Sequence, residues 1–378
     1  PMDRLNRRDF VKKAALGAAG TGALASCSSD IDSVGSNDPG LVSGPEVRWR
    51  LASSFPPSLD ILHGAAIEVA DRVSAMTGGR FTMRVFAAGE IVPALEVMDA
   101  VTQGTVQAGF TGDYYYIGKS PALAFGSAIP FGLTTRQQLA WLQQGGGQDL
   151  LREVYSDFGI INFTSGTTGA QFGGWFREPI SSVSDLRGLR MRIPGLAGEI
   201  MTRLGVTVQV LAGADIYPAL ERGAIDATEF VGPYDDEKLG FYAIASNYYI
   251  PGWWEPGLTA TLQVGLDAWN DLPETYKQVL EGACRETTLT TLARYDVENP
   301  KALARLTGEH GVTLRRFSTD IMEAAWKESY AFLEEQAAGD ATFRRIYEPW
   351  KAFRKQSFQY FAGNETAYAN FAFGKLSD

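Results

Sequence analysis

Strand-like and helix-like patterns alternate along the first part of the chain, and this alternation restricts the possible folds more than any other feature. Apolar and polar residues alternate with a period of two over 46–52, 81–86 and 106–110, which is typical of strands. Between these segments, 60–77 and 95–103 carry apolar residues at helical spacing. Strands that alternate with helices pair in parallel, so we expect an α/β layer fold.

A later strand ends at an arginine. Apolar residues alternate with Arg190 and Arg192 over 189–193, and Pro194 then ends the strand before a helix pattern at 197–201. Open α/β sheets hold ligands where a strand ends and a helix starts. The planar guanidinium of an arginine fits a carboxylate with two parallel hydrogen bonds. We therefore expect Arg192 to bind a carboxylate, with a solvated charge on an edge strand as the alternative.

Further strands and helices are expected from residue 170 to the end of the chain. We expect a strand at 170–176, an aromatic loop at 248–257 and a strand at 259–266. A helix that opens at Glu274 could run for about 25 residues, or roughly 37 Å, and so lie across two lobes. The aromatic-rich tail from Phe343 onward is expected to form one long helix.

The first residues of the sequence read as an export signal followed by a tether. Arg7 and Arg8 form a twin arginine, and an Ala/Gly-rich run follows that is shorter than the roughly 20 apolar residues of a membrane span. The box Leu24-Ala25-Ser26-Cys27 resembles a lipoprotein cleavage site, with an ordinary signal peptide as the alternative. Residues 28–45 are rich in Ser, Asp and Gly and read as a disordered tether.

Composition excludes several classes of function. The chain has 378 residues, 45% hydrophobic and 21% charged, which indicates a globular protein with room for two domains. Its net charge of −10 makes it a poor nucleic-acid binder, because phosphates require a basic face. The only two histidines, His63 and His310, lie in no nucleophile or metal motif, so nothing predicts an enzyme.

Three consecutive tyrosines, Tyr114 to Tyr116, follow the strand at 106–110. A tyrosine at a strand end could line a pocket, because it supplies both a flat ring and a hydroxyl group. The same run could equally be amphipathic surface cover.

With these residues in view, the chain resembles the solute-binding proteins of tripartite ATP-independent periplasmic (TRAP) transporters, the DctP family. It is most similar to the subgroup that binds 2-oxo acids and lactate with a metal cation. The stretches that carry the resemblance are 86–93, 169–171, 186–193, 229–242 and 251–255. The last two are specific to the oxo-acid subgroup, and the match covers nearly all of residues 47–370.

The resemblance implies a two-lobed α/β fold of the periplasmic-binding-protein (Venus-flytrap) type, with crossing strands, a long spanning helix and a C-terminal helix. Its expected parts are a signal at 1–27, a tether at 28–45, lobe 1 at 46–165 plus 258–275, lobe 2 at 166–257 plus 276–341, and a C-terminal dimerisation helix at 342–378. The aromatics of that last helix exceed what one face of a surface helix needs, which favours a homodimer.

The resemblance also implies roles for single residues. Arg192 would bind the ligand carboxylate, and Tyr115 and Trp253 would contribute to the ligand pocket. The cation would take side-chain oxygens and one backbone carbonyl, with Gln171 and Glu229 also counted among the ligand-binding residues. The implied metal ligands are Gln171, Glu229, Phe230 (through its carbonyl) and Glu255.

The oxygen atoms of this donor set are chemically suited to a hard cation. Carboxylate, amide and carbonyl oxygens bind Na⁺ or Ca²⁺ and not a soft metal. Without the resemblance, Glu229 and Glu255 would read as surface charges. Phe230 stands where the family commonly has Trp, which leaves the identity of the acid open.

The implied function is capture of a small 2-oxo or 2-hydroxy monocarboxylate, such as pyruvate or lactate, in the periplasm. The partner would be the TRAP membrane permease. A ligand sensor for a membrane receptor would carry the same site, and an enzyme acting on small carboxylic acids is a further alternative.

Overall fold

The computed structural model describes residues 44–375. The predicted signal, Cys27 and almost all of the predicted tether lie outside these residues. Within them, no helix combines the length and the apolar character needed to cross a membrane.

The first sheet confirms the parallel pairing expected from the alternating patterns. Its strand order is β2-β1-β3-β10-β4. The strands are β1 (Val47–Ser53), β2 (Phe81–Phe86), β3 (Ala108–Thr111), β4 (Ile160–Gly169) and β10 (Leu258–Gly265). β1 runs parallel to β2 and β3, whereas β10 is antiparallel to β3 and β4. The helices α2 (Leu62–Met76) and α3 (Val97–Thr102) connect the parallel strands.

The second sheet has the order β11-β9-β5-β8-β6-β7. Its strands are β5 (Trp175–Phe176), β6 (Arg190–Arg192), β7 (Thr207–Gln209), β8 (Ala227–Thr228), β9 (Asn247–Ile250) and β11 (Thr313–Arg316). The strand expected at 170–176 exists only as β5, because Gly174 has a φ of +80° and interrupts the extended backbone. β6 is parallel to both β7 and β8, so the carboxyl ends of these strands share one edge.

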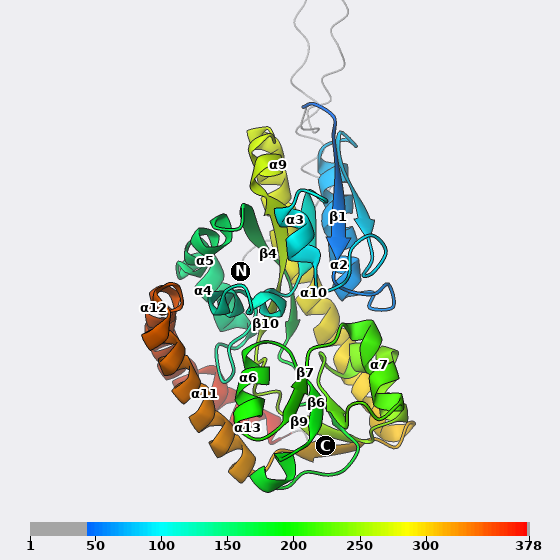
Figure 1. Cartoon of the computed structure of the whole chain (residues 1–378), viewed down its shortest axis with the longest axis vertical. Coiled ribbons are helices and arrows are strands. Elements are labelled where there is room, and N and C mark those ends of the chain that lie inside the picture. The colour runs from blue at the N-terminus through cyan, green and yellow to red at the C-terminus, as the bar shows by residue number, and fades with distance from the viewer. Residues whose placement is uncertain (1–43, 376–378) are drawn as a thin grey trace, which may run out of the picture. The chain divides into compact units, whose positions relative to one another are not determined.

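The chain crosses between the two sheets from β4 to β5 and from β9 to β10, and the long helix α10 (Glu274–Gly308) packs against elements of both parts (Figure 1). It is longer than the expected helix, which would have ended before Pro300. Ala302 and Leu306 are fully buried beyond that proline. Packing of this last stretch outweighs the backbone hydrogen bond that a proline removes.

The remaining helices complete the layers on both sheets. They are η1 (Asp113–Tyr116), η2 (Pro121–Gly126), α4 (Thr135–Gln144), α5 (Gly147–Ser156), η3 (Val183–Leu186), α6 (Gly195–Arg203), α7 (Gly213–Glu221), α8 (Pro233–Leu239), η4 (Phe241–Ala243), α9 (Leu266–Asn270) and α11 (Thr319–Gly339). The boundaries of the two lobes given above stay a prediction.

The C-terminal tail is two helices and not the single expected one. α12 (Ala341–Gly363) and α13 (Glu365–Phe373) meet at Asn364, whose φ of −115° and ψ of −91° leave the helical region. The first half of α12 belongs to the core of its own chain, because Trp350 is fully buried with its ring 5.6 Å from that of Phe125. The exposed aromatics lie further along, at Tyr360, Tyr368, Phe371 and Phe373.

Asp113 begins η1, directly before the three tyrosines, and is fully buried. Its Oδ2 accepts a hydrogen bond of 3.0 Å from Thr261 Oγ1, while its Oδ1 has no partner among the described residues. Burial raises the pKa of Asp113 to about 7. Between pH 4 and pH 7 the folded protein therefore holds this proton more tightly than the unfolded chain does, and stability falls as the pH rises through that window.

We predict that Asp113→Asn removes this dependence, because the amide has the same shape and stays neutral. The free energy of unfolding of the variant, relative to wild type, should rise by about 1.4 kcal/mol per pH unit inside the window. Urea denaturation at pH 5 and pH 7 measures this difference. Asp157→Asn, on an exposed aspartate, is the matched control, and a constant difference between wild type and Asp113→Asn would contradict the assignment.

Candidate functional site

Register in the second sheet brings Arg192 and Glu229 to the same edge. Arg192 is the last residue of β6 and lies opposite Thr228, the last residue of β8, so Glu229 follows at the adjacent strand end. Side chains two positions apart on a strand lie on the same face, so Arg190 and Arg192 share one. Their environments differ along the strand: Arg190, at the start of β6, is exposed and paired with Asp226, whereas Arg192, at its end, is buried.

Arg192 is held on three sides, and one side of its guanidinium has spare donors. Nε donates to the Leu211 carbonyl at 3.1 Å, and Nη1 donates to the Glu229 carbonyl at 3.0 Å and to the Glu229 carboxylate. Nη2 has only a long contact of 3.4 Å with the Tyr115 hydroxyl. A guanidinium carries five N–H groups, so Nη2 is the position that can still serve a ligand.

The site concentrates charge where side chains are shielded from solvent. The side chains of Arg192 and Glu229 are each only 1% exposed. Burial raises the pKa of Glu229, and the positive charge of Arg192 works against that rise. Burial also raises the pKa of Glu255 well above its usual range, and the negative charge of nearby Glu229 adds to the effect. The negative charge of Asp236 adds to the rise in the pKa of Glu229. A cation bound beside Glu229 and Glu255 would favour their charged forms and so oppose both shifts.

Backbone hydrogen bonds join the loops that carry the other predicted residues. The Gln171 amide donates to the Glu255 carbonyl at 3.1 Å, and the Gly252 amide donates to the Gln171 carbonyl at 3.1 Å. The Phe172 amide donates to the Val231 carbonyl at 3.0 Å. Three segments far apart in the sequence therefore meet at one place.

Each of the three predicted side-chain metal ligands leaves one buried oxygen without a hydrogen-bond partner within residues 44–375. These atoms are Gln171 Oε1, Glu229 Oε2 and Glu255 Oε2. The Gln171 amide is oriented by its Nε2, which donates to Thr168 Oγ1 at 3.2 Å. Buried polar atoms are normally paired, so three unpaired oxygens on joined loops fit a hard cation. Across the described part of the chain, no group of three or more His, Cys, Asp or Glu side chains is placed to hold a metal ion. A cation at this site would therefore also need the Gln171 amide oxygen or a backbone carbonyl.

Phe230 and the tyrosines enclose the arginine. The Phe230 ring is buried, with its centroid 5.5 Å from the Arg192 guanidinium carbon. Tyr115 contacts Arg192 from η1, and Tyr114 packs on Tyr115 with ring centroids 4.5 Å apart. Burial raises the pKa of both tyrosines, so both keep their hydroxyl protons. The family resemblance singled out only Tyr115, and the run of three tyrosines gives no sign that Tyr114 packs beside it.

Trp253 is the predicted site residue that the hydrogen bonds do not join to the others. Its side chain is 3% exposed and its Nε1 finds no partner among residues 44–375. Its ring stacks on Phe131 with centroids 5.0 Å apart, and the Phe131 amide donates to its carbonyl at 2.7 Å. Its role in the ligand pocket stays a prediction.

Comparison with known proteins gives a family model and a close relative. The model for bacterial extracellular solute-binding proteins, family 7 (DctP), matches residues 52–340. A monocarboxylate 2-oxoacid-binding periplasmic protein from Nostoc sp. is 54% identical over 368 residues, which cover 97% of this chain and 99% of that protein.

Two solved structures are similar over most of the chain. The first is a dimeric TRAP transporter solute-binding protein from Bordetella bronchiseptica, with calcium and picolinate bound in one site and the other site apo. It is 43% identical, with a TM-score of 0.87, and the match covers 88% of this chain and 99% of that one. A TRAP periplasmic solute-binding protein from Pseudoalteromonas atlantica, with bound sodium and pyruvate, is 36% identical with a TM-score of 0.83 and coverages of 86% and 99%.

Proposed function

The chain belongs to the DctP family of TRAP transporter solute-binding proteins, which are binding proteins and not enzymes, and from this premise we propose what it binds. Its ligand is a small 2-oxo or 2-hydroxy monocarboxylate, taken up together with Na⁺ or Ca²⁺ outside the cytoplasm. The loaded protein delivers this acid to a TRAP membrane permease. The relatives named for 2-oxoacids, or holding pyruvate or picolinate with a cation, support this reading.

The observation that carries the proposal is the set of three unpaired buried oxygens beside a buried arginine. Gln171, Glu229 and Glu255 supply these oxygens to the cation, and the Phe230 carbonyl is the fourth protein donor. When bound, the cation offsets negative charge on the protein and on the ligand. Arg192 donates to the ligand carboxylate from Nη2, Tyr115 adds a hydroxyl group, and Trp253 forms a wall.

A thermal-shift screen of small carboxylates tests the ligand class. A ligand that binds only the folded state raises the melting temperature in proportion to the logarithm of its concentration over Kd. Pyruvate and lactate should raise it in the presence of Na⁺ or Ca²⁺, whereas a dicarboxylate of similar size should not. Stabilisation by the dicarboxylate alone would contradict the proposed class.

Export by the twin-arginine signal and lipid attachment at Cys27 complete the proposed localisation. The observations behind them are the Arg7-Arg8 pair and the Leu24 to Cys27 box. A single acyl chain holds a protein only weakly on a membrane, so a stable anchor at Cys27 would carry more than one chain.

We also propose a homodimer that forms through the distal part of the C-terminal helices. Tyr368, Phe371 and Phe373 on α13 are each about 70% exposed, and clustered exposed apolar side chains usually mark an interface. The Bordetella relative is a dimer, which supports a dimeric state but does not bear on which helices form the interface.

We predict that changing these three aromatics to serine yields a folded monomer that keeps its ligand affinity. The fold should survive because the buried half of α12, which holds Trp350, is untouched. Light scattering gives the mass. Leu289→Ser, at a side chain on α10 with 69% exposure, is the matched control and should leave the mass unchanged. A wild-type monomer at micromolar concentration would contradict the dimer.

A further inference from the structure

Asp236 is a buried carboxylate that lies outside the set of proposed ligands, and it joins three elements behind the site. Its Oδ2 accepts hydrogen bonds from Trp175 Nε1 at 2.9 Å and from the Tyr248 hydroxyl at 2.7 Å. Its Oδ1 accepts from the Val231 amide at 3.1 Å. Only 1% of the residue is exposed, so these three donors take the place of water.

Val231 connects this carboxylate to the proposed cation ligands. It follows Phe230 directly and lies two residues after Glu229. Its carbonyl accepts from the amide of Phe172, the residue after Gln171. The Asp236 carboxylate thus fixes the loop that carries Glu229 and Phe230. Through Val231 it also fixes the backbone next to Gln171.

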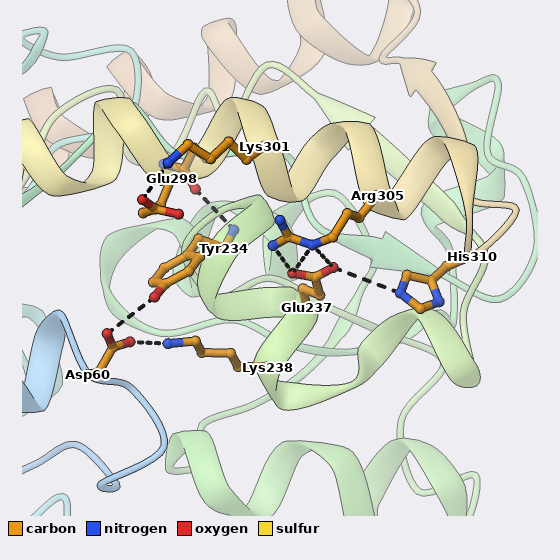
Figure 2. Close-up of polar contacts among 9 residues, drawn as sticks. Asp60, Tyr234, Glu237, Lys238, Glu298, Lys301, Arg305 and His310 are labelled. Atoms are coloured by element: carbon orange, nitrogen blue, oxygen red, sulfur yellow. Dashed lines mark hydrogen bonds and ion pairs between the residues drawn. The ribbon is translucent and has the colours of Figure 1, made fainter.

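The helix that carries Asp236 is itself firmly attached to α10 (Figure 2). Figure 2 shows Glu237 on α8 facing Arg305 on α10, and Arg305 Nε donates to Glu237 Oε1 at 2.9 Å. The Tyr234 amide donates to Asn299 Oδ1 at 3.0 Å. A hydrogen bond of 2.5 Å from the Tyr295 hydroxyl to Asp235 adds a third attachment. Asp236 therefore projects from a base that is held independently of the site.

Two of the three partners of Asp236 can only donate, so each carboxylate oxygen must accept at least one hydrogen bond. Trp Nε1 and a backbone amide can only donate, whereas a tyrosine hydroxyl can donate or accept. The Trp175 and Tyr248 rings stack 3.9 Å apart, which fixes the directions of their polar groups. An asparagine amide of the same shape cannot satisfy this set, because its NH₂ group would face Trp175 Nε1 or the Val231 amide, neither of which can accept.

We propose that Asp236 is a positioning residue for cation and ligand binding: it holds the 229–231 loop so that the Glu229 side chain and the Phe230 carbonyl face the cation. The expected effect of Asp236 on ligand affinity rests on the proposed function. The attachment of the 229–231 loop by Asp236 does not depend on any ligand.

Asp236→Asn tests the proposal, because it keeps the shape and introduces one misplaced donor. In either orientation, the new NH₂ group faces Trp175 Nε1 or the Val231 amide. Losing a buried hydrogen bond to a charged group should weaken pyruvate binding at saturating Na⁺ or Ca²⁺ by roughly tenfold or more. Asp235→Asn is the matched control, since this equally buried neighbour bonds Tyr295 and not the loop, and its affinity should stay within about twofold.

A second substitution distinguishes positioning from a general loss of stability. Trp175→Phe removes the donor that conflicts with the NH₂ group, so the amide oxygen can then accept from Val231 and its NH₂ can face Tyr248. Asp236→Asn/Trp175→Phe should therefore bind pyruvate more tightly than Asp236→Asn alone. Unchanged affinity in Asp236→Asn, or weaker binding in the double variant, would overturn the proposal.

Hydrogen exchange on the ligand-free proteins separates this inference from the proposed function. In Asp236→Asn, exchange should quicken at the amides of 229–231 and at Phe172, while α10 stays protected. Faster exchange spread over the whole second sheet would mean that Asp236 serves the fold alone and would overturn the proposal. A wild-type protein that binds no oxo acid with either cation would refute the proposed function, and the exchange pattern would still decide the role of Asp236.

Discussion

Replacing Arg192 by Lys is expected to lower the affinity for a small 2-oxo acid by about 2 to 5 kcal/mol, or roughly 30-fold to several thousand-fold, without unfolding the protein. The guanidinium reaches the Leu211 carbonyl, Glu229 and the Tyr115 hydroxyl at the same time because its donors point in three directions. A lysine keeps the charge but places it at one point on a flexible stem. It would leave at least one buried acceptor, or the ligand carboxylate, poorly paired.

Calorimetry at saturating cation measures this loss, and thermal unfolding checks the fold. Arg190→Lys is a matched control on the same strand, because Arg190 is exposed and pairs with Asp226 outside the site. Its affinity should equal that of wild type. An Arg192→Lys protein that binds as tightly as wild type would remove Arg192 from the site.

Replacing Glu255 by Gln should weaken ligand binding, and a higher cation concentration should partly restore it. The glutamine keeps the shape and one oxygen but removes a negative charge that attracts the cation. Because cation and acid bind as linked partners, weaker cation binding reduces the apparent affinity for the acid at any fixed cation concentration. We expect a loss of about tenfold or more at low cation concentration, which corresponds to at least 1.4 kcal/mol.

The restoration by cation is the distinguishing result for Glu255. Titrations at several concentrations of Na⁺ or Ca²⁺ should converge towards the wild-type affinity as the cation saturates. Glu281→Gln, at a partly exposed glutamate on α10, is the control and should show no change. A loss in Glu255→Gln that is equal at all cation concentrations would show that Glu255 acts through structure and does not bind the metal.

Local sequence patterns were sufficient for most of the layer architecture. The sequence located β1, β2 and β10 to within one or two residues. For β1 and β2 the signal was the alternation of apolar residues, which arises because one face of a strand is buried in the layer. The patterns failed where tertiary packing decides. α10 continues past Pro300, and the C-terminal tail bends at Asn364. The spacing of apolar residues predicts neither feature, because one depends on packing against distant elements and the other on a local change of φ and ψ.

The site was predictable only in part, for a related reason. Arg192 could be located by its place at the end of a strand. Gln171, Glu229 and Glu255 came only from the family resemblance, because the loops that carry them are far apart in the sequence and are joined by backbone hydrogen bonds that no local pattern predicts. Asp236 looks like one of several charges on a short surface helix, and only its three buried donors reveal a role.

Ligand binding is expected to require a cation held by Gln171, Glu229 and Glu255. The most direct measurement is a calorimetric titration of pyruvate into desalted, chelator-treated protein with a large organic cation as the only counter-ion, repeated after addition of Na⁺ or Ca²⁺. We predict negligible binding before the addition and tight binding after it, because the buried carboxylates and the ligand would otherwise repel one another. Equal affinity before and after would show that no cation bridges protein and ligand, and would assign Glu229 and Glu255 a structural role.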